Sequence, residues 1–263
     1  MGLTVRTLGC SGAIAAGCKT TSFLLDDDVL IDAGTGVNDL TFEALAGIDH
    51  VLLSHSHLDH VLSVPLLADT GLRLRKSQGR PPVTVHALPQ TLKALHDHLL
   101  NGVIWPDFTR VPSADRPALR LVPIAVGEVL VVGSRKRHIE VLNAEHIVPG
   151  VGFAVDAGSA GCWVYSGDTG PNPLLWQRLR HMQVSHLVIE TAFGDDEAEL
   201  ARISHHLCPK LLGEELRQLA GCVDVHITHV KPGEMDLVMA QIGRLGVPHR
   251  VRALAAGDLM RWG

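Results

Sequence analysis

His55-Ser56-His57-Leu58-Asp59-His60 is the stretch of sequence that decides the fold. It holds three imidazoles and one carboxylate, directly after an apolar segment at 49–54 that predicts a buried strand. Imidazole nitrogens and carboxylate oxygens are ligands that divalent cations such as zinc take in proteins. His55 and His57 alternate as side chains of an extended loop do, and Asp59 and His60 can turn to a second position. The stretch therefore predicts two pairs of metal ligands beyond one strand end.

Three further candidate ligands lie far along the chain, at His146, Asp168 and His229. Each follows a predicted strand, and these strands cover residues 139–142, 161–166 and 223–228. Loops beyond strand ends are where α/β enzymes place their chemistry. We expect His146 to complete the first site, His229 to complete the second, and the Asp168 carboxylate to bridge two ions.

The rest of the chain alternates predicted strands with predicted helices. Other strands are expected at residues 3–8, 21–25, 29–32, 83–86, 119–123, 128–132, 152–155, 186–190 and 250–254. Helices are expected at residues 38–46, 61–74, 89–100, 173–182, 207–219 and 237–245. No Pro-, Gly- or Ser-rich linker divides the sequence. Two similar halves, with strands inside and helices outside, predict an α/β protein, an αββα sandwich that forms one domain over residues 1–263.

Composition narrows the class of partner. The chain is 46% hydrophobic and 19% charged, and its formal net charge is −5. An acidic chain argues against a long nucleic acid as partner, because gripping many phosphates needs a basic face. The five cysteines are odd in number and show no C-x-x-C spacing, which favours a reducing cytoplasm over a disulfide framework. No apolar run is long enough to predict a membrane span or a membrane partner.

The ligand series is similar to that of the metallo-β-lactamase superfamily. The resemblance rests on His55-x-His57-x-Asp59-His60, followed in order by His146, Asp168 and His229. It covers nearly the whole chain, and it implies the αββα fold with two bound divalent metal ions. Asp32 matches the early aspartate of the superfamily, which supports the ligands. The superfamily hosts many hydrolases, so the series alone leaves the substrate open.

Other segments resemble the class II 3′,5′-cyclic-nucleotide phosphodiesterases. The matching segments are His57-Leu58-Asp59-His60-Val61-Leu62-Ser63, Asn101-Gly102-Val103-Ile104-Trp105-Pro106-Asp107-Phe108, Ser166-Gly167-Asp168-Thr169-Gly170-Pro171, Ile189-Glu190-Thr191-Ala192-Phe193, His206-Leu207-Cys208-Pro209-Lys210-Leu211-Leu212 and Ile227-Thr228-His229-Val230-Lys231-Pro232. One departure is Cys208, where that family more often has threonine. The resemblance implies hydrolysis of a small cyclic nucleotide, with cyclic AMP as the expected substrate and a 5′-nucleoside monophosphate as the product.

The expected mechanism uses a hydroxide activated by two metals, which attacks phosphorus in line with the departing O3′. His206 is the candidate donor of a proton to that oxygen, with Glu190 orienting its ring, as similarity to ribonuclease Z also implies. His205 is the rival for this role. Asp59 counts among both the metal ligands and the catalytic residues.

Candidate substrate contacts are less specific than the ligands. Trp105 and Phe108 are candidates for stacking a purine, although they equally fit a loop that anchors itself in the core. Ser63 and Lys231 are candidates for contacts to phosphate or ribose, and ordinary packing or solvation explains them equally well.

Three alternatives stay open. The first is a ribonuclease Z-like RNA phosphodiesterase, although the sequence shows no basic arm and only one basic cluster, Arg73-Leu74-Arg75-Lys76 with Arg80, between His60 and His146. The second is another small-molecule hydrolase of this fold, such as a lactonase, sulfatase or thioesterase. The third is a metal-binding protein without catalysis, against which the complete ligand series argues.

The metal, the assembly and the choice between cyclic AMP and cyclic GMP also stay open. Zinc is the default cation for such ligands, and manganese or iron fits the same donor set. Relatives of this kind commonly form homodimers, and the sequence does not locate an interface.

Overall fold

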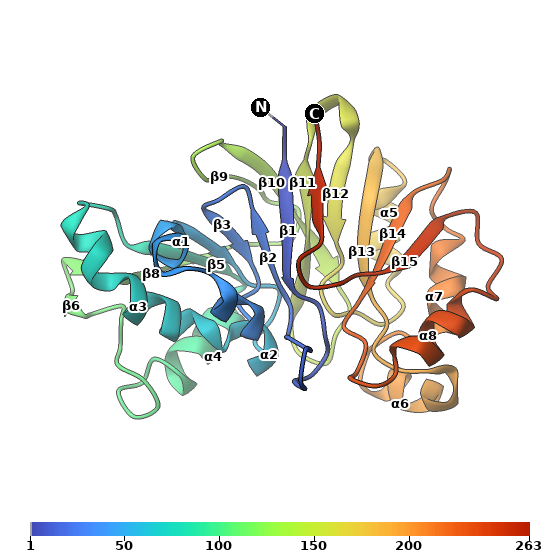
Figure 1. Cartoon of the computed structure of the whole chain (residues 1–263), viewed down its shortest axis with the longest axis horizontal. Coiled ribbons are helices and arrows are strands. Elements are labelled where there is room, and N and C mark those ends of the chain that lie inside the picture. The colour runs from blue at the N-terminus through green and yellow to red at the C-terminus, as the bar shows by residue number, and fades with distance from the viewer. Residues whose placement is uncertain (1) are drawn as a thin grey trace.

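The computed structural model describes residues 2–263, and two seven-stranded sheets form its centre (Figure 1). The first sheet has the strand order β16 (Leu259–Arg261), β1 (Thr4–Gly9), β2 (Ser22–Leu25), β3 (Val29–Ile31), β4 (His50–Leu52), β5 (Val83–Ala87) and β8 (Leu119–Pro123). The second has the order β15 (Arg250–Ala253), β14 (Asp224–Thr228), β13 (Val184–Glu190), β12 (Cys162–Tyr165), β11 (Gly150–Asp156), β10 (Arg137–Ala144) and β9 (Val129–Val132).

Helices cover the outer faces of both sheets (Figure 1). On the side of the first sheet lie α1 (Phe42–Gly47), α2 (Leu58–Val61), α3 (Ser63–Ser77) and α4 (Pro89–His98). On the side of the second sheet lie α5 (Pro173–Leu179), α6 (Ala198–Ile203), α7 (Pro209–Leu216) and α8 (Met235–Ile242). Short 3-10 turns span Thr35–Asp39, Gly158–Ala160 and Asp195–Glu197, and a two-stranded ribbon joins β6 (Pro112–Ser113) to β7 (Arg116–Pro117).

Three apolar clusters account for the layers. One cluster joins the facing sides of the two sheets and contains Phe23 and Leu52 from the first sheet with Trp163 and Tyr165 from the second. A second cluster joins the first sheet to α1, α3 and α4, and a third joins the second sheet to α5, α7 and α8. Strands buried on both faces explain the continuous apolar runs of β2, β3 and β11. The predicted αββα sandwich is confirmed.

Strand direction brings the candidate ligands to one end of the molecule. β3, β4 and β5 run parallel to one another, as do β12, β13 and β14. β10 has the same direction as β12, because each is antiparallel to β11 between them. The carboxyl ends of β3, β4, β10, β12, β13 and β14 therefore share an edge of the sandwich.

Several element boundaries differ from the sequence-based predictions. The helix expected at 61–74 begins earlier, because α2 already includes Asp59 and His60. The helix expected at 38–46 is a 3-10 turn followed by α1, which begins at Phe42 because the Thr41 hydroxyl caps it by accepting a hydrogen bond from Ala44 N.

Four short elements were not predicted at all: α6, the ribbon β6–β7, and the C-terminal strand β16. β16 pairs with β1, so the chain returns to the first sheet after β15, which the sequence analysis took as the last strand. None of the helices described in residues 2–263 is long and apolar enough to cross a bilayer.

Candidate metal centre and active site

All seven predicted ligands lie at the shared edge of the sandwich. His55 and His57 occupy the turn after β4, and Asp59 and His60 lie in the one-turn helix α2, where His57 has the extended N-cap conformation. The ring centroid of His55 lies 4.7 Å from that of His57 and 4.2 Å from that of His60, so side chains before and after this turn lie together. His146, Asp168 and His229 follow β10, β12 and β14, which belong to the other sheet.

His55, His57 and His146 form the first group. Their ring nitrogens lie within 4.8 Å of one another, and His146 Nε2 is 3.2 Å from His57 Nδ1. His146 Nδ1 lies 3.0 Å from the carbonyl oxygen of His205. A carbonyl only accepts, so Nδ1 carries the proton and Nε2 keeps a free lone pair directed at the group.

Asp59, His60 and His229 form the second group, also with ligand atoms within 4.8 Å of one another. Asp59 Oδ2 is 3.2 Å from His229 Nε2 and 3.6 Å from His60 Nε2. Asp168 stands between the two groups. Its Oδ2 lies 3.0 Å from His229 Nε2, 3.3 Å from His60 Nε2 and 3.8 Å from His55 Nε2. One carboxylate oxygen thus has ring nitrogens from both groups within 4 Å, as a bridging ligand requires.

The chemistry of these atoms fits divalent cations. Within residues 2–263, His55 Nε2, His60 Nε2 and Asp168 Oδ1 are buried polar atoms without a hydrogen-bond partner. Such atoms are costly in a folded protein unless water or an ion satisfies them. Together, the seven predicted ligands supply five imidazoles and two carboxylates, and two sites of mixed nitrogen and oxygen donors are what zinc, manganese or iron takes.

The electrostatics of the cluster also favour positive charge. Burial, reinforced by neighbouring His60, holds the pKa of His55 well below its usual range, so its ring is neutral and free to coordinate. Burial disfavours charge on His60 too, but ionised Asp168 and Asp32 raise the pKa of His60 well above its usual range. Burial opposes ionisation of Asp168, yet His229 and His60 hold its pKa well below the usual range. A bound cation would supply the positive charge that a proton on His60 otherwise supplies.

Asp32 organises the second group from behind. Its buried carboxylate accepts hydrogen bonds from His60 Nδ1 at 2.7 Å, from Ser54 N and Oγ at 2.7 Å each, and from the Tyr165 hydroxyl at 3.0 Å. Because Nδ1 of His60 must donate, Nε2 is the nitrogen left for a metal. The Asp32 backbone has a φ of 55°, an unfavourable conformation for a non-glycine residue, which the four hydrogen bonds hold in place.

Sequence reasoning identified Asp32 as a supporting residue but missed Ser54 and Tyr165. Tyr165, the only tyrosine of the chain, gave a weak indication of such a role, because it lies in the strand predicted at 161–166, shortly before Asp168. A tyrosine hydroxyl that is buried there needs a hydrogen-bond partner. Nothing in the sequence indicated which carboxylate it would reach.

His206 lies against both ligand groups. Its ring stacks on His229 with centroids 5.3 Å apart and meets His146 edge-on at 4.8 Å. His206 Nδ1 donates to Glu190 Oε1 at 2.6 Å. Burial lowers the pKa of His206, but the charge and hydrogen bond of Glu190 outweigh burial and raise it above its usual value. His146, Asp168 and His206 also lie close enough to hold an ion together, so the ring is within reach of bound metal.

Glu190 is fixed at the end of β13. Its Oε1 also accepts from Thr169 N at 3.1 Å, and its Oε2 accepts from Ala192 N at 3.1 Å and Leu207 N at 3.2 Å. These backbone donors hold the carboxylate in one position, so Glu190 orients the His206 ring and stabilises its protonated form.

The geometry separates His206 from its predicted rival. The His205 side chain is 41% exposed and faces Glu145, whose Oε1 is 3.4 Å from His205 Nδ1. His205 reaches the cluster through its backbone carbonyl, which accepts from His146, and its φ of 54° places that carbonyl there.

The structure assigns other roles to three of the four candidate substrate contacts. Phe108 is 3% exposed and belongs to the apolar cluster under α4, so it cannot stack a base. The buried Ser63 hydroxyl donates to the Gly34 carbonyl at 2.8 Å. The Lys231 ammonium donates to the Gly12 carbonyl at 2.8 Å and anchors the glycine-rich loop after β1.

Trp105, the fourth candidate, packs half-buried against the same apolar cluster as Phe108. Its contacts therefore match the anchoring of the loop after α4 better than the stacking of a base.

Comparison with known proteins places the chain in a family. Residues 27–251 match the sequence pattern of the family described as the beta-lactamase superfamily domain. Because this match covers most of the chain, the chain belongs to that family and is a hydrolase of the metallo-β-lactamase fold. The yeast PDE1 structure superposes with a TM-score of 0.82 over 98% of this chain and 99% of that one, at 16% identity, a likeness in fold.

Two curated relatives differ in their activity. A probable 3′,5′-cyclic-nucleotide phosphodiesterase of Yersinia pestis is 25% identical over 70% of this chain and 57% of its own length. A ribonuclease Z of Bradyrhizobium sp. (strain ORS 278) is 38% identical over 40% of this chain and 33% of its own length. The chain thus matches only 57% of the length of the first relative and 33% of the second.

Proposed function

We propose that the chain is a metal-dependent phosphodiesterase that hydrolyses 3′,5′-cyclic nucleotides, with cyclic AMP as the preferred substrate, to 5′-nucleoside monophosphates. The observation that carries this proposal is the His206–Glu190 pair, held at 2.6 Å beside both groups of metal-ligand candidates. The similarity to the Yersinia pestis phosphodiesterase supports the cyclic substrate, because it extends over 70% of the chain.

The chain would hold one cation with His55, His57 and His146, and the other with Asp59, His60 and His229, with Asp168 between them. Two divalent cations there would neutralise the charge of a phosphodiester. They would also lower the pKa of a bound water, which then serves as the nucleophile in hydrolysis. Asp32, through His60, and His205, through His146, keep the ligand nitrogens oriented before substrate arrives.

His206 would complete the reaction. Addition of water to the cyclic phosphate breaks the bond between phosphorus and O3′, and O3′ leaves as an alkoxide that needs a proton. The raised pKa of His206 favours the protonated form of its ring, and the ring lies at the edge of the metal-ligand cluster. Glu190 stabilises the imidazolium before transfer and holds the ring afterwards, so that a proton from solvent restores it.

Ribonuclease Z-like RNA hydrolysis is the second candidate. The ribonuclease Z of Bradyrhizobium sp. favours it, because its 38% identity to this chain is higher than the 25% of the Yersinia pestis phosphodiesterase. The ribonuclease Z match covers less of this chain, 40% against 70%. The same ligands and the same His206–Glu190 pair would serve an RNA phosphodiester. The net charge of −5 weighs against it.

Parallel assays test the proposal. The zinc-loaded and manganese-loaded chain is given cyclic AMP, cyclic GMP, a precursor transfer RNA and a lactone, and products are separated by liquid chromatography. We expect 5′-AMP from cyclic AMP and no cleavage of the transfer RNA. Cleavage of the transfer RNA with no turnover of either cyclic nucleotide would replace the proposal with the second candidate.

A further inference from the structure

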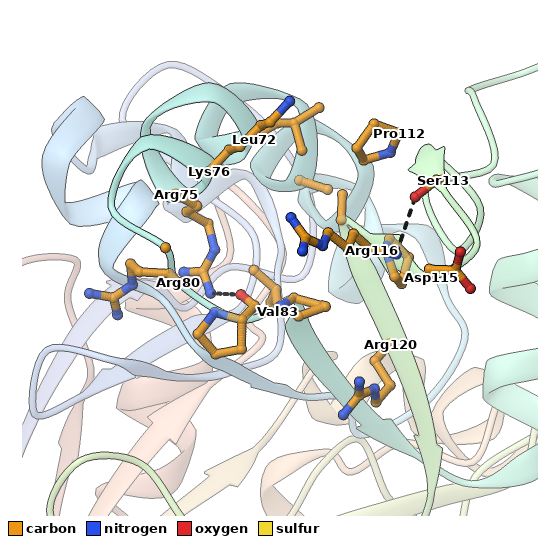
Figure 2. Close-up of a pocket in the computed structure, with 16 residues that line it drawn as sticks. Leu72, Arg75, Lys76, Arg80, Val83, Pro112, Ser113, Asp115, Arg116 and Arg120 are labelled. Atoms are coloured by element: carbon orange, nitrogen blue, oxygen red, sulfur yellow. Dashed lines mark hydrogen bonds between the residues drawn. The ribbon is translucent and has the colours of Figure 1, made fainter.

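A second cavity lies at the outer edge of the first sheet and shares no residue with the metal-ligand cluster. It has a volume of about 600 Å³ and opens between the carboxyl-terminal half of α3 and the ribbon β6–β7, beside β8 (Figure 2). Figure 1 shows β6 at the far side of the first sheet from α2, which carries Asp59 and His60. The backbone holds the ribbon in place, because Ala118 N donates to the carbonyls of Phe108 and Val111.

Positive charge dominates the lining of this cavity. Its charged residues are Arg75, Lys76, Arg80, Asp115, Arg116 and Arg120. The Asp115 carboxylate points away from the Arg116 guanidinium in Figure 2. This concentration of cations is unusual in a chain whose net charge is −5.

Two of these cations are fixed and three are available. Arg75 donates to the carbonyls of Ala46, Ile48 and Pro81, and it shares the Asp49 carboxylate with Arg80. In the described part of the chain, the side chains of Lys76, Arg116 and Arg120 have no ion pair. Figure 2 shows the Arg116 guanidinium directed from the ribbon toward α3, across the cavity.

The rest of the lining is apolar. Leu72, Val83, Pro82 and Pro112 form a wall beside these cations. A volume of about 600 Å³ falls within the range of small-molecule sites, which combine an apolar lining with a few charged groups. Arginine forks match phosphate oxygens, and apolar walls take up a ring.

We propose that this cavity, which we call the arginine pocket, is a binding site for a small organic phosphate of the nucleoside 5′-monophosphate class. Arg116, Arg120 and Lys76 bind the phosphate, and the wall of Leu72 and prolines receives the base. A concave site suits a compact anion better than a long nucleic acid, which tracks an extended basic face. The proposal does not rest on the activity of the metal centre.

Hydrogen–deuterium exchange of the metal-loaded chain locates the binding, because it separates this site from the catalytic one. The probes are 5′-AMP, inorganic phosphate and a single-stranded oligonucleotide. We expect 5′-AMP to slow exchange in peptides covering residues 72–82 and 112–120. The double variant R116A/R120A should need about tenfold more 5′-AMP, or still more, for the same protection, because it loses two charge-assisted contacts.

The exposed Arg73, which lies on α3 outside the lining, provides the matched control. Arg73→Ala should leave the protection unchanged, and Lys76→Ala should weaken it. The proposal fails if 5′-AMP gives no protection there, or if the double variant binds as the parent does. It also fails if inorganic phosphate protects at the same concentration as 5′-AMP, or if the oligonucleotide protects at a lower one.

Discussion

At the scale of single residues, Asp32 links the fold to the chemistry. It directly follows β3, and its carboxylate accepts one hydrogen bond from a metal-ligand candidate, two from Ser54 and one from Tyr165 across the sheet interface. Tyr165 belongs to the second sheet, so its hydroxyl connects the two halves at the point where the site forms. The orientation of His60 therefore depends on packing between the sheets.

Tyr165→Phe tests this connection. The variant keeps the ring and its packing against Phe23 but loses the donor to Asp32. We expect the free energy of unfolding to fall by about 1 kcal/mol and metal affinity to fall by about tenfold. Denaturant titration and competition with a chromophoric chelator measure the two effects. Unchanged metal affinity would show that Tyr165 serves packing alone.

His206→Ala tests the proton donor. Loss of a general acid should lower turnover of the phosphodiester by about 10²–10⁴-fold. Metal content should stay near that of the parent, because the seven ligand candidates remain. The exposed His181 is the matched control, and His181→Ala should change neither quantity. Unchanged turnover would remove His206 from the mechanism, and loss of metal would make it a ligand.

The ligand candidates could be predicted from sequence because each follows a strand, and strand ends at one sheet edge meet. Their convergence is now a structural observation, whereas their role as metal ligands stays a prediction. Phe108 could not be placed in this way, since an aromatic residue in a loop has the same sequence signature whether it anchors the loop or contacts a substrate. Only its 3% exposure decides between these.

At the scale of elements, each sheet holds a pair of histidines on neighbouring parallel strands. His50 Nδ1 lies 3.1 Å from His86 Nε2 between β4 and β5, and His186 Nδ1 lies 2.9 Å from His226 Nε2 between β13 and β14. Burial lowers the pKa of His86 and of His226 to about 4. These neutral pairs fill positions in the sheets that charged rings could not occupy.

The His226 pair predicts a pH dependence of stability. Burial, then Arg252 and His186, lower the pKa of His226 from 6.5 to about 4, so the unfolded chain binds this proton first as pH falls. The contribution of the neutral His226 ring to the free energy of unfolding is complete above pH 6.5 and is lost progressively toward pH 4. The loss amounts to about 2–3 kcal/mol.

Denaturant unfolding at several pH values measures this effect. His226→Gln removes the titrating ring and keeps a polar group for Arg252, so its stability should vary less between pH 6.5 and 4 than that of the parent. The parent and the variant are both measured in the presence of a chelator, which removes the pH dependence of metal binding. Equal slopes would contradict the assignment.

The bounds of short helices and strands were the hardest feature to predict from the sequence. Apolar strands such as β2, β3 and β11 could be predicted from their composition, because strands buried on both faces have few polar residues. Strand β16 has only three residues, and two of them are exposed. It forms because its backbone pairs with β1, a contact between opposite ends of the chain that no local pattern contains.

At the scale of the whole molecule, the metal centre lies where the two sheets meet. His55, His57, Asp59 and His60 follow a strand of the first sheet, and His146, Asp168 and His229 follow strands of the second. Bound cations would therefore hold the two halves together at this edge.

Metal removal should consequently destabilise the entire fold. Cations that bind the folded chain at about a thousand times their dissociation constant add about 4 kcal/mol. Treatment with a chelator should lower the unfolding temperature by on the order of 10 °C, and added zinc should restore it. Calorimetry with and without chelator measures the shift. Identical unfolding temperatures would indicate that the seven side chains do not bind metal.

The most direct measurement is an anomalous difference map from crystals of the purified chain, recorded at the absorption edge of the bound metal. We expect two peaks, one among His55, His57 and His146 and the other among Asp59, His60 and His229, with Asp168 in contact with both. A map from metal-supplemented crystals with no peak among these seven side chains would contradict this expectation.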